Sequence, residues 1–292
     1  MQIIGLVGAG HMGSALGWAL REGGHDVVTS LAGRSLRTAR LAEEAGLRIA
    51  DRPVDVVAEA DVILVVTPPG AALDAATEIA MMATTPGLAG RLARAGRPLV
   101  VDLNAVSPAT AAEAASVLTA AGFDFVDGSI SGPPPTVRPG ARLYLSGPRA
   151  THVADLRWTH AEPVVVGDRI GAASAVKMST ASVYKGLMGL MAQAIRAAAA
   201  HGVLEPVMAD LGDGFGTPYE VALAATKAHR YVAEMHEIAR SQAAVGLTPS
   251  LFAAFAAAWA DIADQPLAHG QPETLPRDIT ARQVADGLRK VE

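Results

Sequence analysis

The chain contains no cysteine, and this absence removes several classes of chemistry at once. Disulfide bridges, thiolate metal sites and cysteine nucleophiles are all excluded. No uninterrupted apolar run reaches the roughly 18 residues that a membrane-spanning helix needs, so we expect no membrane partner. No basic segment precedes the apolar start of the chain, so we predict no signal peptide and a cytoplasmic location.

Lysine is scarce as well. The chain has 29 acidic and 24 basic residues, a formal net charge of −5, and both signs are interspersed, so nucleic acid is not an expected partner. The only lysines are Lys177, Lys185, Lys227 and Lys290, and all other basic residues are arginines. Lysine can lose its proton near neutral pH and arginine cannot, so each lysine is a candidate for a chemical role.

A glycine-rich turn near the start of the chain is the feature around which the rest is organised. The apolar residues 3–7 are typical of a buried strand, and small and apolar residues at helical spacing follow the turn. In a G-x-G-x-x-G turn, Gly8 allows the tight bend, Gly10 lets the backbone approach a pyrophosphate, and Gly13 lets helix and strand pack closely. The pyrophosphate would bind the free N–H groups that begin the helix, at His11 and Met12. We predict a dinucleotide site here, the alternative being a plain glycine turn.

The segment after the second predicted strand, residues 25–30, indicates which dinucleotide. An NAD-preferring site carries a carboxylate about 20 residues past the glycines, where it accepts the ribose hydroxyls. No acid stands at that place, and the chain continues instead to Arg34, Ser35 and Arg37. Two guanidinium groups and a hydroxyl suit a 2′-phosphate, which favours NADP over NAD. The alternative is that both arginines are merely solvated at the start of a helix.

Strands and helices alternate up to residue 168, which predicts a doubly wound, mostly parallel α/β sheet of the Rossmann type. Ligands bind at the carboxyl edge of such a sheet. The predicted strands at 61–66, 98–102 and 123–127 run into edge loops at residues 67–70, 104–107 and 128–132. We therefore expect Thr67, Pro68 and Asn104 to contact the cofactor. Residues 84–96 are expected to lie on the protein surface.

The second half of the chain, residues 169–292, is predicted to be all helical. Residues 170–201 contain no proline and are rich in alanine, methionine and leucine, which predicts one helix about 45 Å long. Further helices are expected at 204–211, 219–242, 249–263 and 278–289, with breaks at 212–214 and 246–249. The apolar surface of this domain suggests a homodimer.

Lys177 lies about two turns into the long predicted helix, within plausible reach of a nicotinamide. It shares one helix face with Thr180 and Tyr184 by i, i+3 and i+7 spacing. A partly buried lysine with a lowered pKa can donate a proton to a carbonyl oxygen or accept one in reverse. The alternative is a lysine that snorkels from an amphipathic helix.

Three motifs together resemble the β-hydroxyacid dehydrogenase and 6-phosphogluconate dehydrogenase superfamily along nearly the whole chain. Residues 5–13, GLVGAGHMG, are similar to its cofactor fingerprint; residues 127–132, DGSISG, to its substrate-binding segment; and residues 171–177, GAASAVK, to the run that bears its catalytic lysine. Residues 104–108, 131–134 and 142–148 look closer to an uncharacterised branch with a shortened phosphogluconate-dehydrogenase-like helical domain.

The resemblance implies that Lys177 is the general acid/base and that Ser131 and Gly132 bind a substrate carboxylate. Ser129, Thr180, Tyr184 and Arg230 are expected around the same substrate. Several positions depart from the family pattern. Pro133 replaces a second glycine and has no N–H to donate, Ala181 stands where the family has an asparagine, and Ala233 stands where it has a lysine.

The resulting expectation is an NADP-dependent oxidoreductase that transfers a hydride between nicotinamide and a carbonyl or alcohol carbon of a small, carboxylate-bearing metabolite. Two alternatives remain open, an imine reductase of the same superfamily and a catalytically silent NADP-binding sensor or partner protein. The eight histidines are scattered, and no metal site is expected.

Overall fold

The computed structural model describes residues 1–212 and 214–289, without the side chains of residues 91 and 93–95. Asp213, in the predicted break at 212–214, and Lys290 lie outside these residues. The chain forms two compact units, Met1–Lys177 and Met178–Glu292. The division falls inside the long helix, whereas the sequence suggested residue 168. Each unit is described by itself.

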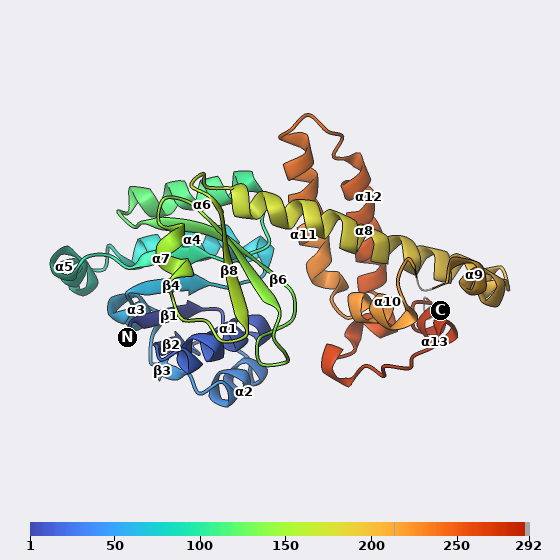
Figure 1. Ribbon diagram of the computed structural model, residues 1–292, viewed down its shortest axis with the longest axis horizontal. Coiled ribbons are helices and arrows are strands. Elements are labelled where there is room, and N and C mark those ends of the chain that lie inside the picture. The colour runs from blue at the N-terminus through green and yellow to red at the C-terminus, as the bar shows by residue number, and fades with distance from the viewer. Residues whose placement is uncertain (213, 290–292) are drawn as a thin grey trace. The chain divides into compact units, whose positions relative to one another are not determined.

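The first unit is built on one eight-stranded sheet with the strand order β3-β2-β1-β4-β5-β6-β7-β8 (Figure 1). All neighbouring strands pair in parallel except β6 and β7, which are antiparallel. The predicted α/β class with a mostly parallel Rossmann sheet is confirmed. The strands are β1 (Ile3–Val7), β2 (Asp26–Ser30), β3 (Arg48–Ala50), β4 (Val62–Val65), β5 (Leu99–Asp102), β6 (Phe125–Ser131), β7 (Ala141–Ser146) and β8 (Ala161–Gly167).

Helices cover both faces of this sheet because alternate strand residues point to opposite sides. Leu6 and Leu64 pack on one face with α1, α2 and α7, while Ile63 and Val65 pack on the other face with α3, α4, α5 and α6. Burial of both faces explains why β4 and β5 are continuous apolar runs. The helices are α1 (His11–Glu22), α2 (Leu36–Glu44), α3 (Pro53–Glu59), η1 (Pro69–Ala71), α4 (Ala72–Met82), α5 (Pro86–Ala95), α6 (Pro108–Ala120) and α7 (Ala150–Ala154).

The second unit is helical throughout its described residues. The 29-residue helix α8 begins in the first unit and continues through the second. Trp259 of α12 and Ile195 of α8 are fully buried. Val183, Tyr184 and Leu190 of α8 are 65%, 70% and 59% exposed, and the homodimer stays a prediction. The helices are α8 (Ala172–Ala200), α9 (Leu204–Leu211), α10 (Pro218–Ala225), α11 (Ala228–Ala243), α12 (Ser250–Ala263), η2 (Pro266–His269), η3 (Pro272–Thr274) and α13 (Ala281–Gly287).

Two local expectations were wrong, and three short elements were not predicted. The short strand β3 and the helix α3 were not predicted. The segment 84–96, expected to lie on the surface, contains the unpredicted helix α5, which buries Leu88 and Leu92. The helix expected at 219–242 is divided into α10 and α11 at Thr226, whose hydroxyl donates to Leu223 O. The loop expected after residue 127 is strand as far as Ser131, because residues 127–131 pair with β7.

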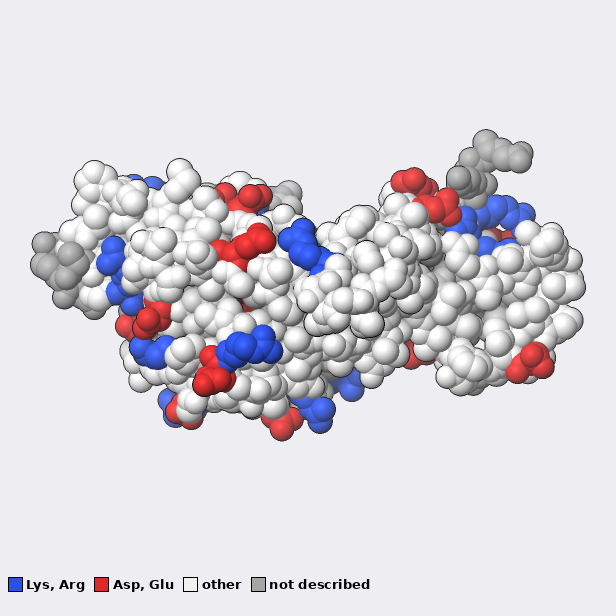
Figure 2. Space-filling view, turned by 90° about the horizontal axis from the view of Figure 1, so that it is seen from above, with Lys and Arg blue, Asp and Glu red and all other residues white. Residues whose placement is uncertain are grey.

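The surface of the first unit carries both signs of charge. On the face drawn in Figure 2, blue and red side chains lie interspersed over this unit. Among the residues that the structure describes, no helix is both long and apolar enough to cross a bilayer.

Two carboxylates are buried where β5 and β6 lie side by side. Asp102 ends β5 and is in register with Asp127 of β6, and the two residues are 4% and 1% exposed. Burial raises the pKa of Asp102 to about 7, the Asp127 charge adds to the rise, and hydrogen bonding with Asn104 opposes it. Asp102 therefore holds its proton in the folded protein over a pH range in which an unfolded chain would release it.

This raised pKa predicts a pH-dependent stability. Because the folded state binds the Asp102 proton more tightly than the unfolded state does, the parent protein should lose stability as the pH rises from about 4 to about 7. Asp102→Asn has no carboxyl group to titrate at this position, so its stability should not show this fall. The difference between the unfolding free energies of parent and variant should therefore change by about 1–4 kcal/mol between pH 4 and pH 7. Denaturant titrations at pH 4.5, 6 and 7.5 measure it. Parallel pH curves for the two proteins would contradict the prediction, and Asp124→Asn on the surface is the control.

Candidate cofactor and catalytic site

The glycine turn between β1 and α1 has the geometry that its sequence predicted. Gly8 adopts a φ of 97°, and a Cβ there would lie 2.3 Å from Val66 O. A Cβ on Gly13 would lie 2.0 Å from Gly8 O, so the first turn of α1 packs directly on the strand end. Both positions exclude a side chain because of contacts inside the protein.

Gly10 differs from the other two glycines. It is the N-cap of α1 with an extended backbone, and a Cβ there would meet no protein atom within 4 Å. Its missing side chain therefore leaves open space at the start of a 12-residue helix, beside His11 and Met12. The N–H groups of such a first turn suit an anionic ligand. A pyrophosphate fits this position.

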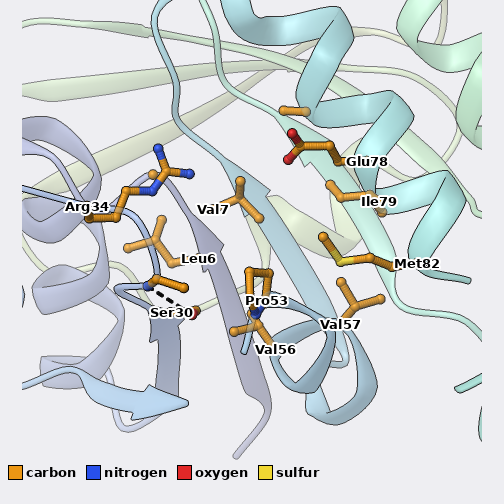
Figure 3. A pocket seen from close by; sticks show the side chains of 13 residues that line it. Leu6, Val7, Ser30, Arg34, Pro53, Val56, Val57, Glu78, Ile79 and Met82 are labelled. Atoms are coloured by element: carbon orange, nitrogen blue, oxygen red, sulfur yellow. Dashed lines mark hydrogen bonds between the residues drawn. The ribbon is translucent and has the colours of Figure 1, made fainter. Parts of the chain in front are cut away.

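A pocket adjoins the turn at the carboxyl ends of β1 and β2. Most of the residues that line it are apolar, and Figure 3 shows Arg34 and Glu78 on different sides of it. A pocket with apolar walls beside an anion site suits a flat ring such as adenine. Sequence reasoning missed most of the lining because these residues carry no motif and come together only through packing. The pocket is lined by Leu6, Val7, Gly8, Ser30, Ala32, Arg34, Pro53, Val56, Val57, Ala75, Glu78, Ile79 and Met82.

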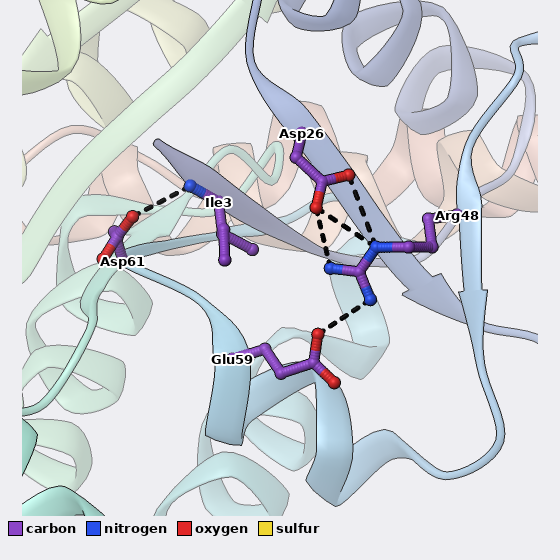
Figure 4. Close-up of polar contacts among 5 residues, drawn as sticks. All are labelled: Ile3, Asp26, Arg48, Glu59 and Asp61. Carbon is purple, nitrogen blue, oxygen red and sulfur yellow. Dashed lines mark hydrogen bonds and ion pairs between the residues drawn. The ribbon is translucent and has the colours of Figure 1, made fainter. Parts of the chain in front are cut away.

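Asp26, the acidic residue of β2, lies at the amino end of that strand, whereas the pocket lies at its carboxyl end. Asp26 begins the strand and forms an ion pair with Arg48 at 2.8 Å, while Arg48 also binds Glu59 at 2.7 Å (Figure 4). Asp61 accepts from Ile3 N in the same region. The carboxyl end of β2 instead leads to a basic segment.

That basic segment is exposed. Arg34 and Arg37 both face solvent, and Ser35 caps α2, its Oγ accepting from Thr38 N at 3.2 Å. The segment thus places two guanidinium groups at the start of a helix, where the dipole also favours an anion.

Thr67 and Asn104 meet at the carboxyl ends of β4 and β5. Asn104 Oδ1 accepts from Thr67 N at 2.6 Å, and Asn104 N donates to Asp102 Oδ1 at 2.9 Å. Asn104 Nδ2 and Thr67 Oγ1 are buried without a hydrogen-bond partner, a state that folded proteins rarely leave unresolved. Pro68 beside them is exposed. These two unpartnered polar atoms fit a bound polar group at this edge of the sheet.

Lys177 lies where β6 ends. Its Nζ donates to Ile130 O at 2.6 Å, which brings the ammonium next to Ser131 and Gly132. Gly132 has a φ of 108°, and a Cβ there would lie 2.5 Å from Gly140 O. The structure therefore brings Lys177 next to the Ser131–Gly132 segment, which lies more than 40 positions earlier in the sequence.

Ser129 is placed differently from its expected role. Its side chain is fully buried, and its Oγ donates to Ala173 O at 2.9 Å. The hydroxyl therefore links β6 to the start of α8, and this position does not support substrate binding by Ser129.

The other predicted substrate residues belong to the second unit. Thr180 is half-buried, Tyr184 is 70% exposed and Arg230 is exposed. Their roles stay predictions. A contact that sequence reasoning missed lies in this unit: Lys185 forms a buried ion pair with Glu234 and lies 4.4 Å from the Tyr231 ring centroid.

Among the residues that the structure describes, no three histidine or acidic side chains gather as a metal site would require.

Comparison with known proteins identifies two regions. The NAD binding domain of 6-phosphogluconate dehydrogenase matches residues 3–161, and a domain of unknown function, DUF1932, matches residues 198–262. An uncharacterised 28.5 kDa protein of Methanothermus fervidus is 24% identical over 216 residues, which cover 74% of this chain and 78% of the relative.

Solved structures share the fold. One conserved protein of unknown function, described as similar to 3-hydroxyacid dehydrogenases, is 27% identical with a TM-score of 0.62, covering 90% of this chain and 97% of its own. The 3-hydroxyisobutyrate dehydrogenase of Mycobacterium tuberculosis, solved with L-serine, is 20% identical with a TM-score of 0.67, covering 99% and 100%.

Imine reductases have the same fold at 17–21% identity and TM-scores of 0.52 to 0.54. The match to residues 3–161 spans more than half of the chain and contains the glycine turn and the pocket described above. The chain therefore belongs to the family that carries the NAD-binding domain of 6-phosphogluconate dehydrogenase.

Proposed function

We propose that the protein is an NADP-dependent oxidoreductase that interconverts a carbonyl and an alcohol in a small, carboxylate-bearing metabolite. The observation that carries this proposal is the position of Lys177, whose Nζ donates to Ile130 O beside Ser131 in the unit that holds the glycine turn. A binding domain alone would need no ionisable group at this edge of the sheet. An oxidoreductase acting on a carbonyl does need one.

The cofactor would be held by groups from four loops. The N–H groups that begin α1 at His11 and Met12 would bind the pyrophosphate, and the apolar pocket would take the adenine. Arg34, Ser35 and Arg37 would receive a 2′-phosphate, and the absence of an acid at the end of β2 favours that choice. Thr67, Pro68 and Asn104 would line the path toward the nicotinamide. When bound, NADP(H) supplies or accepts the electron pair of the reaction.

Lys177 would donate or accept the proton of the reaction. In the direction of reduction its ammonium would donate a proton to the carbonyl oxygen while the carbon receives a hydride, and the product is an alcohol. In oxidation the neutral amine takes the proton from the hydroxyl. Ile130 O orients the ammonium from one side.

The substrate would bind at Ser131 and Gly132, with Thr180, Tyr184 and Arg230 as further candidates. The Ser131 hydroxyl is partly exposed and can donate to a carboxylate. Pro133 offers no N–H, so the carboxylate would have one donor fewer than a second glycine would provide.

Two other functions remain as rivals. Imine reductases share this fold, and reduction of a C=N bond needs a similar proton donor. A silent NADP-binding protein needs the glycine turn but not Lys177. A lysine at this edge, in a chain whose cations are mostly arginine, favours the enzymes over the silent protein.

Removal of the Lys177 amine should reveal its role. In Lys177→Ala we expect turnover to fall by at least about 10²-fold, the usual contribution of a general acid, while NADPH affinity stays unchanged. NADPH oxidation is followed over aldehydes, keto acids and cyclic imines for both proteins. Undiminished turnover would end the lysine mechanism. Tight NADPH binding without turnover on any class would favour the silent binder, and turnover on cyclic imines alone would favour the imine reductase.

The basic segment after β2 should discriminate between cofactors. In Arg34→Ala we expect NADPH affinity to fall by about tenfold or more, because a charge-assisted hydrogen bond to phosphate is lost, while NADH affinity changes little. Fluorescence titration with both cofactors measures the two affinities, and Arg40→Ala, on an exposed part of α2, is the control. An equal loss for NADH and NADPH, or tighter binding of NADH by the parent protein, would contradict the assignment.

Substitutions at Gly10 and Gly13 should affect different properties, cofactor binding at Gly10 and protein stability at Gly13. Gly10→Ala should change the free energy of unfolding by less than about 1 kcal/mol, since an N-cap alanine is only mildly unfavourable, yet weaken NADPH binding markedly because the methyl group occupies the open space. Gly13→Ala should instead destabilise the protein, because the added Cβ would overlap Gly8 O. Thermal unfolding and NADPH titration of the two variants give the comparison. Unaltered NADPH affinity in Gly10→Ala would place the pyrophosphate elsewhere.

A further inference from the structure

Three side-chain links join β6 to the first two turns of α8. The Asp127 carboxylate accepts from the start of the helix, Ser129 Oγ donates to Ala173 O, and Lys177 Nζ donates back to Ile130 O. The links involve residues 127–130 of the strand and residues 171–177 at the start of the helix. The strand and the helix are thus held together from the first residue of the junction to the ammonium itself.

Asp127 makes most of this junction. Its Oδ2 accepts from Gly171 N at 2.9 Å, from Ser174 N at 3.1 Å and from Ser146 Oγ at 2.9 Å. Its Oδ1 accepts from Ser174 Oγ at 2.6 Å. Ser146 Oγ in turn accepts from Ala173 N at 3.0 Å, so β7 takes part as well. Every one of these contacts is buried.

The carboxylate fits this place for two reasons. The first N–H groups of a helix lack partners within the helix, and Asp127 satisfies two of them directly. A negative charge also lies favourably at the positive end of the helix dipole. Burial raises the pKa of Asp127, and the hydrogen bonds from Ser174, Ser146 and Gly171 oppose that rise.

The path from this carboxylate to the ammonium is short. Ser174 precedes Lys177 by three residues, about one helical turn, and Asp127 precedes Ile130 by three residues on the strand. Loosening the first turn of α8 would therefore shift the Lys177 backbone relative to the carbonyl that orients its Nζ.

We propose that Asp127 is a positioning residue for Lys177: it fixes the first turn of α8 on β6 and thereby holds the Lys177 ammonium at Ile130 O, beside Ser131. The catalytic meaning of this placement rests on the proposed function. The placement itself can be measured without a substrate.

Amine labelling of the intact protein tests the placement. The parent, Asp127→Asn and Asp124→Asn are treated briefly with acetic anhydride, and acetylation of each lysine is quantified by peptide mass spectrometry. In Asp127→Asn we expect Lys177 to be labelled about fivefold faster, the effect of losing a hydrogen bond of ordinary strength, while Lys185 and Lys227 change little. Asp124 is three residues earlier and pairs on the surface with Arg149, so Asp124→Asn should leave all three rates unchanged.

Each outcome decides the proposal. Unchanged Lys177 labelling together with a lower melting temperature would overturn it, because Asp127 would then only stabilise the fold. Equal acceleration at Lys177, Lys185 and Lys227 would overturn it too, since that result means general loosening. If Asp127→Asn does not fold, Ser174→Ala removes one of the four donors and should accelerate Lys177 labelling in the same direction, and its failure to do so would also overturn the proposal.

Activity provides a separate readout. If a substrate is found, Asp127→Asn should lower kcat while the KM for NADPH stays unchanged, because the cofactor loops are untouched. A fall in NADPH affinity without a fall in kcat would contradict a role through Lys177. If no substrate is turned over by the parent, the proposed function fails while the labelling result still stands.

Discussion

The close approach of backbone to backbone around Gly8 and Gly13 is the constraint on which the first unit depends. The first turn of α1 lies so close to the end of β1 that a methyl group on Gly13 would overlap Gly8 O, and a methyl group on Gly8 would overlap Val66 O, which follows β4. This packing directs the start of α1 toward the carboxyl edge of the sheet. The pocket, the basic segment after β2 and the edge loops then surround that start, since parallel strands all end at the same edge.

The junction between β6 and α8 is the second arrangement that matters for function. Here the sheet changes direction, because β7 runs antiparallel to β6 and β8 runs parallel to β7. The chain can therefore return from β8 and begin α8 beside the carboxylate of Asp127. Three side chains make contacts within the first two turns of α8. They are the buried carboxylate of Asp127, the buried hydroxyl of Ser129, and the ammonium of Lys177, which donates to Ile130 O. The proposed proton donor is held by the same contacts that start the long helix.

The second unit shows a different use of buried charge. Lys185 and Glu234 are 13% and 8% exposed and form an ion pair, with the Tyr231 ring beneath the ammonium and Trp259 packed edge-on to that ring. A buried ion pair of this kind is weak evidence for stability, because the loss of solvation offsets much of the attraction. Lys185 comes from α8 and Glu234 from α11, so the pair links these two helices.

The sequence alone determined the features whose physics is local. The glycine spacing, the missing acid after β2, the apolar runs of β4 and β5 and the proline-free helix α8 each follow from a few neighbouring residues. The strand β3 has only three residues and α3 only seven, too few for a periodic pattern to be visible. The break between α10 and α11 lies in an alanine-rich run without proline or glycine, so no local signal marked it.

Only the tertiary structure decided the contacts that join distant segments. Ser129 resembled a substrate residue from its motif, but its hydroxyl is buried against α8, because strand pairing with β7 continues through Ser131 and fixes which way each side chain points. The sequence placed Asp127 in a substrate-binding segment. In the structure its carboxylate caps α8, which begins more than 40 residues later. The pocket lining joins α3 and α4 to β1, which share no motif. Such contacts depend on which faces of the helices and strands pack together. A sequence pattern shows which face of an element is buried, but not which other element covers it.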